Sequence, residues 1–273
     1  MMKSFKNKVV MITGAGGNGI GHHLAMAFAA EGAKLAICDI ANLEATLDTL
    51  PTKTDVYHEV VDMADTAQID QFIEHALNCF DGIDILVNNA GIALGDKTFD
   101  QVTPEDFQRI TDINYWGVVH TTQRLYEHLL SRPEAAILNL SSSQGILALP
   151  NLVPYCTTKF AVRGFTDSIR AEHKVYGIKH VQVHTIHPGR VATNITLNAD
   201  YHGKNTQKFH KELQRGTQPD KAAQIILRGI RKKRDRIFIS DGRQHDILAR
   251  LLPTSSTKVI KMIMKLKGID THK

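Results

Sequence analysis

Tyr155 and Lys159, four residues apart, are the side chains of this sequence best suited to proton transfer. If both lie on one helix, the lysine ammonium is one turn from the phenol and on the same face. A phenol has an ordinary pKa near ~10, and a fixed cation beside it favours the phenolate needed for acid/base work near neutral pH. Ser142 can orient a reacting oxygen from another loop. A Tyr-Lys pair also occurs by chance, with the tyrosine in packing and the lysine in solvent, so the elements that position it decide its meaning.

A glycine-rich segment near the N-terminus predicts a dinucleotide-binding unit. An apolar run at 9–12 enters the segment 13–21, a helical pattern follows to Gly32, and a second apolar run at 35–38 ends at Asp39. In such a strand-turn-helix-strand unit the glycines let the backbone approach a pyrophosphate, which the N–H groups at the helix N-terminus receive. Asp39 is placed to bind a ribose diol. Its charge would repel a 2′-phosphate, so the sequence favours NAD over NADP.

The alternation of apolar runs and helical patterns continues to residue 240. Further strands are predicted at 56–61, 83–87, 135–140, 181–186 and 236–240, and helices at 69–80, within 104–130, from Pro154 towards Gly177, and from Pro219. Seven strands alternating with six helices predict an α/β fold, a Rossmann-type doubly wound parallel sheet in three α/β/α layers. The carboxyl ends of its strands share one edge, so the polar residues that follow them should face one crevice.

Length and composition fit a globular domain with a short extension. The chain has 273 residues, of which 42% are hydrophobic and 22% charged. We expect one dinucleotide-binding and catalytic domain at 1–244 and a basic amphipathic helical extension at 245–273. Residues 194–216 are polar and weakly periodic, and they should lie at the crevice, so they are predicted to form a mobile substrate lid.

Several classes of protein are disfavoured by what the sequence lacks. The 3 cysteines are dispersed and the 14 histidines are scattered without ligand spacing, so neither a disulfide framework nor a metal site is expected. The N-terminus lacks the apolar stretch of a signal peptide, and no run reaches the roughly 18 apolar residues of a membrane span. A cytoplasmic location is therefore predicted. The net charge of +5 comes mainly from residues after 200. No aromatic side chains accompany these charges to stack on bases, so nucleic-acid binding is not expected.

Taken together and in this order, these motifs resemble the short-chain dehydrogenase/reductase family over roughly residues 6–240. The resemblance is carried by the Thr-Gly loop at 13–21, Asp39, Asp62, the segment Asn88-Asn89-Ala90-Gly91, Asn114, Ser142, Tyr155, Lys159, Pro188 and Gly189. Ser142 precedes Tyr155 by 13 positions, which is usual in that family and selects it over Ser141 and Ser143.

The resemblance implies a role for each of four catalytic residues. Tyr155 is the acid/base, Lys159 lowers its pKa and holds the nicotinamide ribose, Ser142 positions the substrate oxygen, and Asn114 anchors a water of the proton relay. The implied cofactor contacts are Gly14, Asn18, Gly19 and Ile20 along the phosphates, Asp39 at the adenosine ribose, Asp62 and Met63 at the adenine, Asn89 and Gly91 beside the ribose, and Pro188, Val191 and Thr193 near the carboxamide, in addition to Tyr155 and Lys159.

One feature departs from the family pattern. Four residues, 15–18, separate Gly14 from Gly19, one more than usual. We expect a one-residue bulge, which the extra glycine permits. The sequence leaves open which of Gly16, Gly17 and Asn18 contacts phosphate.

The resemblance therefore implies an NAD(H)-dependent oxidoreductase that interconverts a secondary alcohol and a ketone and forms a homodimer or homotetramer. The lid and the apolar loop at 146–153 indicate a moderately large apolar substrate. The alternative is a non-catalytic, dinucleotide-binding regulatory protein of the same fold. Binding alone does not require all four catalytic residues, so their joint presence favours the enzyme.

The basic extension leaves three interpretations open. Between residues 258 and 267 the apolar side chains form one broad helical arc with Lys258, Lys261 and Lys265 opposite. Such a helix can pack on the domain or on a second subunit, lie peripherally on a membrane of anionic lipid, or close over an apolar substrate.

Overall fold

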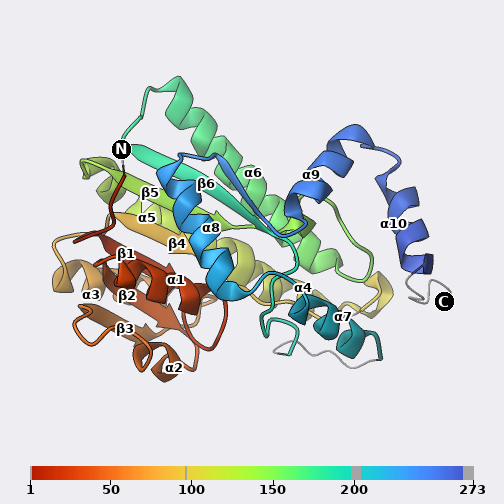
Figure 1. The fold of residues 1–273 in the computed structure, drawn as a ribbon, viewed down its shortest axis with the longest axis horizontal. Coiled ribbons are helices and arrows are strands. Elements are labelled where there is room, and N and C mark those ends of the chain that lie inside the picture. Colours follow the sequence, from red (N-terminus) through yellow and green to blue (C-terminus); the bar gives the residue numbers. More distant parts are fainter. Residues whose placement is uncertain (1, 96, 198–203, 267–273) are drawn as a thin grey trace.

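A seven-stranded parallel sheet forms the centre of the molecule (Figure 1). The computed structural model describes residues 2–95, 97–197 and 204–266. The strands are β1 (Val9–Thr13), β2 (Lys34–Asp39), β3 (Val56–Val60), β4 (Ile85–Asn88), β5 (Ala135–Leu140), β6 (Val181–Pro188) and β7 (Arg236–Ile239). Their spatial order is β3-β2-β1-β4-β5-β6-β7. Successive strands are added on one side of β1 up to β3 and on its other side from β4 onward, so the point where the chain changes side lies between β1 and β4. The predicted doubly wound α/β fold is confirmed.

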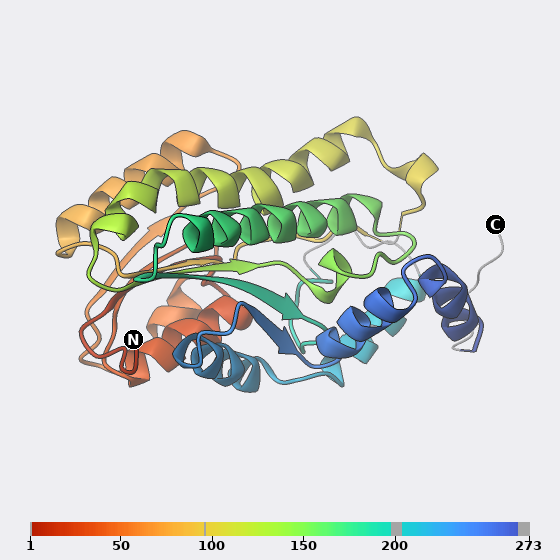
Figure 2. The same ribbon diagram turned by 90° about the horizontal axis from the view of Figure 1, so that it is seen from above.

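Helices cover both faces of the sheet, as Figure 2 shows from above. One face carries α1 (Ile20–Ala30) and α8 (Pro219–Arg231), and the other carries α3 (Thr66–Cys79), α5 (Gly117–Ser131) and α6 (Val153–Val175). Side chains alternate across each strand. Val10 and Ile12 of β1 therefore join the core beneath α1 and α8, whereas Val9 and Met11 join the core beneath α3 and α5.

The helix predicted within 104–130 is one continuous path made of three pieces. Thr103 caps its start by accepting a hydrogen bond from the backbone N–H of Asp106. The path then runs through α4 (Pro104–Thr111), a π-helical turn (Asp112–Trp116) and α5. A π-helical turn contains about one residue more than a turn of α-helix. This turn carries Asn114.

The predicted lid is more regular than expected. Helix α7 (Lys204–Gln214) occupies the second half of the predicted lid, although its weak periodicity did not indicate a helix. That this segment moves as a lid stays a prediction. The remainder of the segment includes residues 198–203, which lie outside the described part of the chain.

The remaining elements of the described chain are α2 (Glu44–Leu47), two 3-10 helices at Phe99–Gln101 and Ser143–Gly145, and two C-terminal helices, α9 (Gly242–Leu251) and α10 (Ser256–Leu266). The boundary predicted between residues 244 and 245 falls inside α9. None of the described helices is both long and apolar enough to cross a lipid bilayer.

Candidate active site

A cavity of about 600 Å³ opens where the strands β1, β2, β4, β5 and β6 end. All fourteen residues predicted to contact a cofactor line it: Gly14, Asn18, Gly19, Ile20, Asp39, Asp62, Met63, Asn89, Gly91, Tyr155, Lys159, Pro188, Val191 and Thr193. Ser142 lines it as well, whereas Asn114 does not. Among the described residues, no three His, Cys, Asp or Glu side chains are grouped as metal ligands would be.

Two amides of the glycine-rich loop are hydrogen-bonded to the segment 39–42. The Gly16 N–H donates to Asp39 Oδ2 at 2.8 Å, and the Gly17 N–H donates to the Asn42 carbonyl at 3.1 Å. Gly17 has a φ of +66°, which favours glycine. A Cβ placed on Gly19, in contrast, would meet nothing within 4 Å. The Gly16 and Gly17 amides are therefore occupied within the chain, which leaves Asn18 and Gly19 as the candidates for phosphate contact; the one-residue bulge stays a prediction.

The side chain of Asn18 is held from the next helix. Its Oδ1 lies 2.9 Å from Nε2 of His23 on α1. Burial lowers the pKa of His23, against the smaller opposing effect of Asp220, so the ring is neutral near pH 7 and its Nε2 tautomer donates to Asn18. The neighbouring His22 donates through Nδ1 to Thr46, whose hydroxyl donates to the Ala15 carbonyl. Both histidines thus support the loop.

Asp39 has two structural partners in addition to its place in the cavity wall. Its Oδ2 accepts from Gly16, and its Oδ1 lies 3.3 Å from the backbone N–H of Ala41. Ile40, Ala41 and Asn42 continue the lining beyond it, and none of them is cationic. The carboxylate therefore faces the cavity without an adjacent arginine.

Asn89 joins the glycine-rich loop to the end of β4. Its side-chain amide donates to the carbonyls of Thr13 at 2.9 Å and Gly14 at 2.7 Å. The Thr13 hydroxyl in return accepts from the backbone N–H groups of Asn89 and Ala90. Because both amide protons of Asn89 are used in this way, it fixes the shape of the cavity wall.

Asn114 is fully buried behind the wall. Its Oδ1 accepts from the Ile92 N–H at 2.8 Å, and its Nδ2 donates to the Ile92 carbonyl at 2.9 Å and lies 3.3 Å from Thr158 Oγ1. A Cβ placed on Gly91 would lie 3.2 Å from both Asn114 Oδ1 and Lys159 Nζ. The two polar groups therefore converge beneath the Gly91 backbone, and Asn114 supports this stretch of the wall.

Tyr155 and Lys159 lie on one helix, as predicted. Helix α6 begins at Val153, and Lys159 Nζ is 5.7 Å from the centre of the Tyr155 ring. The ammonium donates to the Leu140 carbonyl at 3.0 Å, at the end of β5. Ser142 acts on the Tyr155 phenol by lowering its pKa, and its hydroxyl donates to Gln144 Oε1 at 2.5 Å. Tyrosine, serine and lysine therefore meet in one corner of the cavity.

The protonation of this corner differs from the sequence-based expectation. Burial raises the pKa of Tyr155 to about 12, and the hydrogen bond to Ser142 opposes that rise only in part. Burial also lowers the pKa of Lys159 to about 8, so the ammonium remains mostly protonated at pH 7. The expectation that the Tyr155 pKa lies below its usual value is wrong for this structure, because desolvation of the phenolate outweighs the lowering effect of Ser142.

His187, which no sequence pattern singled out, holds the backbone carbonyl of Ser142. The ring is fully buried, stacks on Phe238 with centres 5.3 Å apart, and donates through Nδ1 to the Ser142 carbonyl at 3.0 Å. Burial lowers the pKa of His187 to about 4, so it is neutral near pH 7. Its position directly before Pro188, just after the strand predicted at 181–186, was the only signal in the sequence.

A further part of the wall is apolar. It consists of Ile92, Ala93 and Ile113, which the sequence did not single out, and of Leu152 from the loop at 146–153 and Ile195, Phe209 and Leu213 from the predicted lid. Phe209 and Leu213 come from α7, four residues apart and thus on one helical face. That spacing was readable in the sequence but was outweighed by the polar residues around it.

Fold and site together define a dinucleotide-binding oxidoreductase, and comparison with known proteins assigns the family. A family model described as short chain dehydrogenase matches residues 8–202. SadH of Mycobacterium tuberculosis, named as an oxidoreductase, is 33% identical over 269 residues, which cover 95% of this chain and 96% of SadH.

Solved structures agree with this assignment. A short-chain dehydrogenase/reductase from Burkholderia phymatum in complex with NAD is 25% identical, with a TM-score of 0.80 over 87% of this chain and 90% of that one. Levodione reductase is 26% identical, with a TM-score of 0.77 over 88% and 98%. The chain belongs to the short-chain dehydrogenase/reductase family.

Proposed function

We propose that this protein is an NAD(H)-dependent oxidoreductase that interconverts a secondary alcohol and a ketone. The observation that carries the proposal is the corner of the cavity that Tyr155, Ser142 and Lys159 line together, with the ammonium 5.7 Å from the centre of the Tyr155 ring. A phenol and a hydroxyl that converge on one point can both bind a single carbonyl or alcohol oxygen. The bound nicotinamide supplies or accepts the hydride.

In the direction of ketone reduction, Tyr155 donates its proton to the carbonyl oxygen. The raised pKa keeps the phenol protonated at neutral pH, which suits an acid. Ser142 donates a second hydrogen bond to the same oxygen as negative charge develops there. The Lys159 ammonium, 5.7 Å from the ring centre, stabilises the phenolate that remains.

Asn114 acts on this corner through the backbone. Its two hydrogen bonds to Ile92 hold the 91–92 segment beside Lys159. We assign it the support of the proton relay that returns a proton to Tyr155.

Preference for NAD over NADP rests on Asp39. Its carboxylate lines the cavity, and the side chains that follow it, Ile40, Ala41 and Asn42, offer no positive charge to a 2′-phosphate. The NAD bound in the similar structure from Burkholderia phymatum supports the same choice.

The substrate in this proposal is moderately large and apolar. The wall formed by Ile92, Leu152, Ile195, Phe209 and Leu213 offers apolar surface, next to the polar side chains of Arg109, Gln144, Asn194 and Thr196. Such a wall binds a substrate by excluding water from it, while the Tyr155 corner fixes the reacting oxygen.

A panel of secondary alcohols and ketones with NAD or NADH, monitored by absorbance of the reduced cofactor, tests this proposal. Tyr155→Phe should lose at least about a thousandfold of kcat on the best substrate and still bind NADH, because one general acid contributes roughly that much. Tyr176→Phe is the matched control, since that ring is 74% exposed at the end of α6. Normal turnover by Tyr155→Phe would contradict the acid/base role, and NADH binding without turnover on any substrate would favour a regulatory protein.

A further inference from the structure

The last two described helices form an arm beyond the sheet. This C-terminal arm, residues 242–266, consists of α9, a short link and α10 (Figures 1 and 2). In both views α10 stands away from the sheet and from the helices that cover it. Neither its charge nor its apolar surface is used by the function proposed above.

The base of the arm is fixed to the body of the protein. Asp241, directly before α9, accepts from the Arg190 backbone at 3.0 Å and pairs with its side chain at 2.9 Å. Asp246 on α9 pairs with Arg236 of β7 at 3.6 Å and with Arg250 at 2.9 Å. Helix α9 also packs against the 3-10 turn at Ser143–Gly145. These contacts fix the orientation of α9 relative to the sheet.

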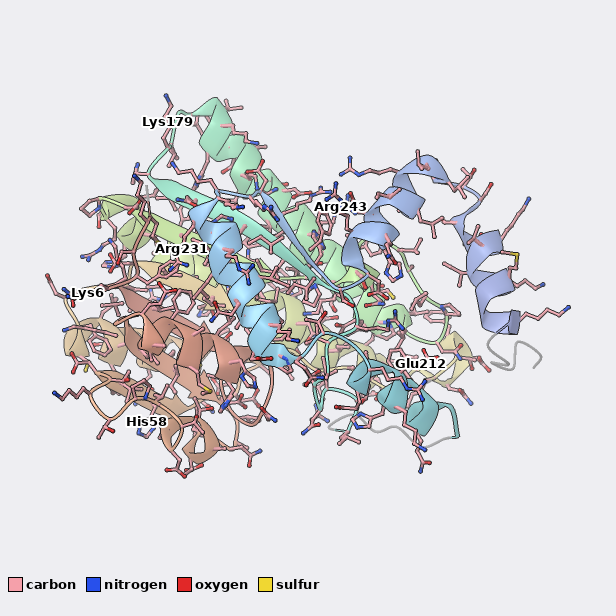
Figure 3. All side chains as sticks on the ribbon, in the orientation of Figure 1. Lys6, His58, Lys179, Glu212, Arg231 and Arg243 are labelled. Atoms are coloured by element: carbon pink, nitrogen blue, oxygen red, sulfur yellow. The ribbon has the colours of Figure 1, made fainter. Side chains whose placement is uncertain are left out.

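The exposed charge of the arm is positive. Its basic residues, Arg243, Arg250, Lys258, Lys261 and Lys265, are all exposed, and Figure 3 labels Arg243 on α9. Its one acidic residue, Asp246, has only 13% of its side chain exposed and is occupied by two arginines. Lysines of α10 therefore meet solvent without an acidic partner in the described part of the arm.

The arm also exposes large aliphatic side chains next to this charge. Ile247 and Leu251 lie one turn apart on α9 and are 47% and 74% exposed, Leu252 follows at 39%, and Met262 on α10 is 57% exposed. Ile260, in contrast, is 8% exposed, so α10 does bury part of its apolar surface. Scattered apolar residues on a surface are ordinary, but a group of them among cations is typical of an interfacial helix.

We propose that the C-terminal arm docks this protein peripherally on an anionic lipid surface. The lysines and arginines attract the lipid headgroups, and the aliphatic side chains enter the boundary between headgroups and acyl chains. A second copy is a poor occupant, because pairing two arms about a two-fold axis brings like charges together. Nucleic acid fits the cations but leaves the aliphatic groups in water.

Sedimentation of the full chain with lipid vesicles tests this proposal. Binding should be at least about tenfold tighter to phosphatidylcholine vesicles containing roughly 30% phosphatidylserine than to phosphatidylcholine alone, and it should weaken as salt is added. The paired variants Lys258→Glu/Lys261→Glu and Leu251→Ser/Leu252→Ser should each lose about tenfold or more of the binding.

Matched controls lie far from the arm. Lys179→Glu removes an exposed lysine at the opposite end in Figure 3, and Val175→Ser removes an aliphatic side chain that is 77% exposed on α6. Both should bind vesicles like the wild type, and circular dichroism should confirm that every variant is folded. Equal binding to neutral and anionic vesicles, or equal losses in arm and control variants, overturns the proposal. So does an arm-dependent dimer, or salt-sensitive binding to DNA without binding to vesicles.

Discussion

Replacing Lys159 by methionine should stabilise the cofactor-free protein near neutral pH while abolishing turnover. The ammonium is buried, and desolvation lowers the pKa of Lys159 to about 8 from an ordinary value of 10.5. At pH 7 the folded protein therefore contains a buried charge that the unfolded chain exposes to water. At about 1.36 kcal/mol per pH unit, this difference makes the charged lysine cost the folded state about 3 kcal/mol. Loss of its hydrogen bond to the Leu140 carbonyl returns about 1 kcal/mol, so a net gain of about 2 kcal/mol is expected.

The pH dependence distinguishes this cause from better packing of methionine. Between pH 8 and 10.5 the unfolded chain keeps the proton that folded Lys159 has released, so the unfolded state binds more protons and the free energy of unfolding of the wild type rises with pH. The methionine variant has no such group. Its stability advantage should therefore shrink by about 2 kcal/mol between pH ~7 and ~9.5.

Urea unfolding followed by far-UV circular dichroism at several pH values measures this difference. Lys179→Met, at an exposed lysine, is the control and should follow the wild type at every pH. If the difference in free energy of unfolding between wild type and Lys159→Met stays constant from pH ~7 to ~9.5, burial of the ammonium does not destabilise the folded protein, and the reasoning is refuted.

Three further predictions concern the cavity wall. Asp39→Asn, which keeps an acceptor for Gly16, should raise affinity for NADP relative to NAD by about tenfold or more, and titration with both cofactors that shows no change would contradict the ribose role. Gly19→Ala should fold normally, because its Cβ meets open space, yet bind NADH at least about tenfold more weakly; Gly16→Ala should instead lower the unfolding temperature, because its Cβ meets the Ala41 carbonyl. His187→Leu should reduce kcat more than NADH affinity, since the ring holds the Ser142 carbonyl, and His187→Asn should recover part of the loss; equal losses in both parameters would argue for a purely structural ring.

Local sequence patterns predicted the sheet because its strands are buried on both faces. Strand β5 was expected at 135–140 and spans Ala135–Leu140, all of it buried. The residues at strand ends were predicted to share a crevice from topology alone, and they line one cavity.

The features that escaped prediction depend on contacts between distant segments. The pKa of Tyr155 depends on how completely the folded chain desolvates the phenol, which a spacing of four residues cannot report. His187 acquires its role only when β6 lies beside the turn after β5, 45 residues earlier in the chain. Helix α7 was hard to predict because most of its residues are polar. Its two apolar residues, Phe209 and Leu213, line the cavity, which the sequence alone does not show.

The π-helical turn at Asp112–Trp116 has a consequence for how this chain tolerates changes in length. Surface loops usually accept insertions and deletions at little cost. In this turn, deleting one residue would restore an ordinary α-helix and leave α4 and α5 near their present orientation, because the turn takes up the one residue that an α-helix there would lack. The deletion would change the backbone that carries Asn114, whose hydrogen bonds to Ile92 support the cavity wall. A chain shortened by one residue here should therefore still fold, with Val118 and Leu125 of α5 buried, and should lose that support of the wall.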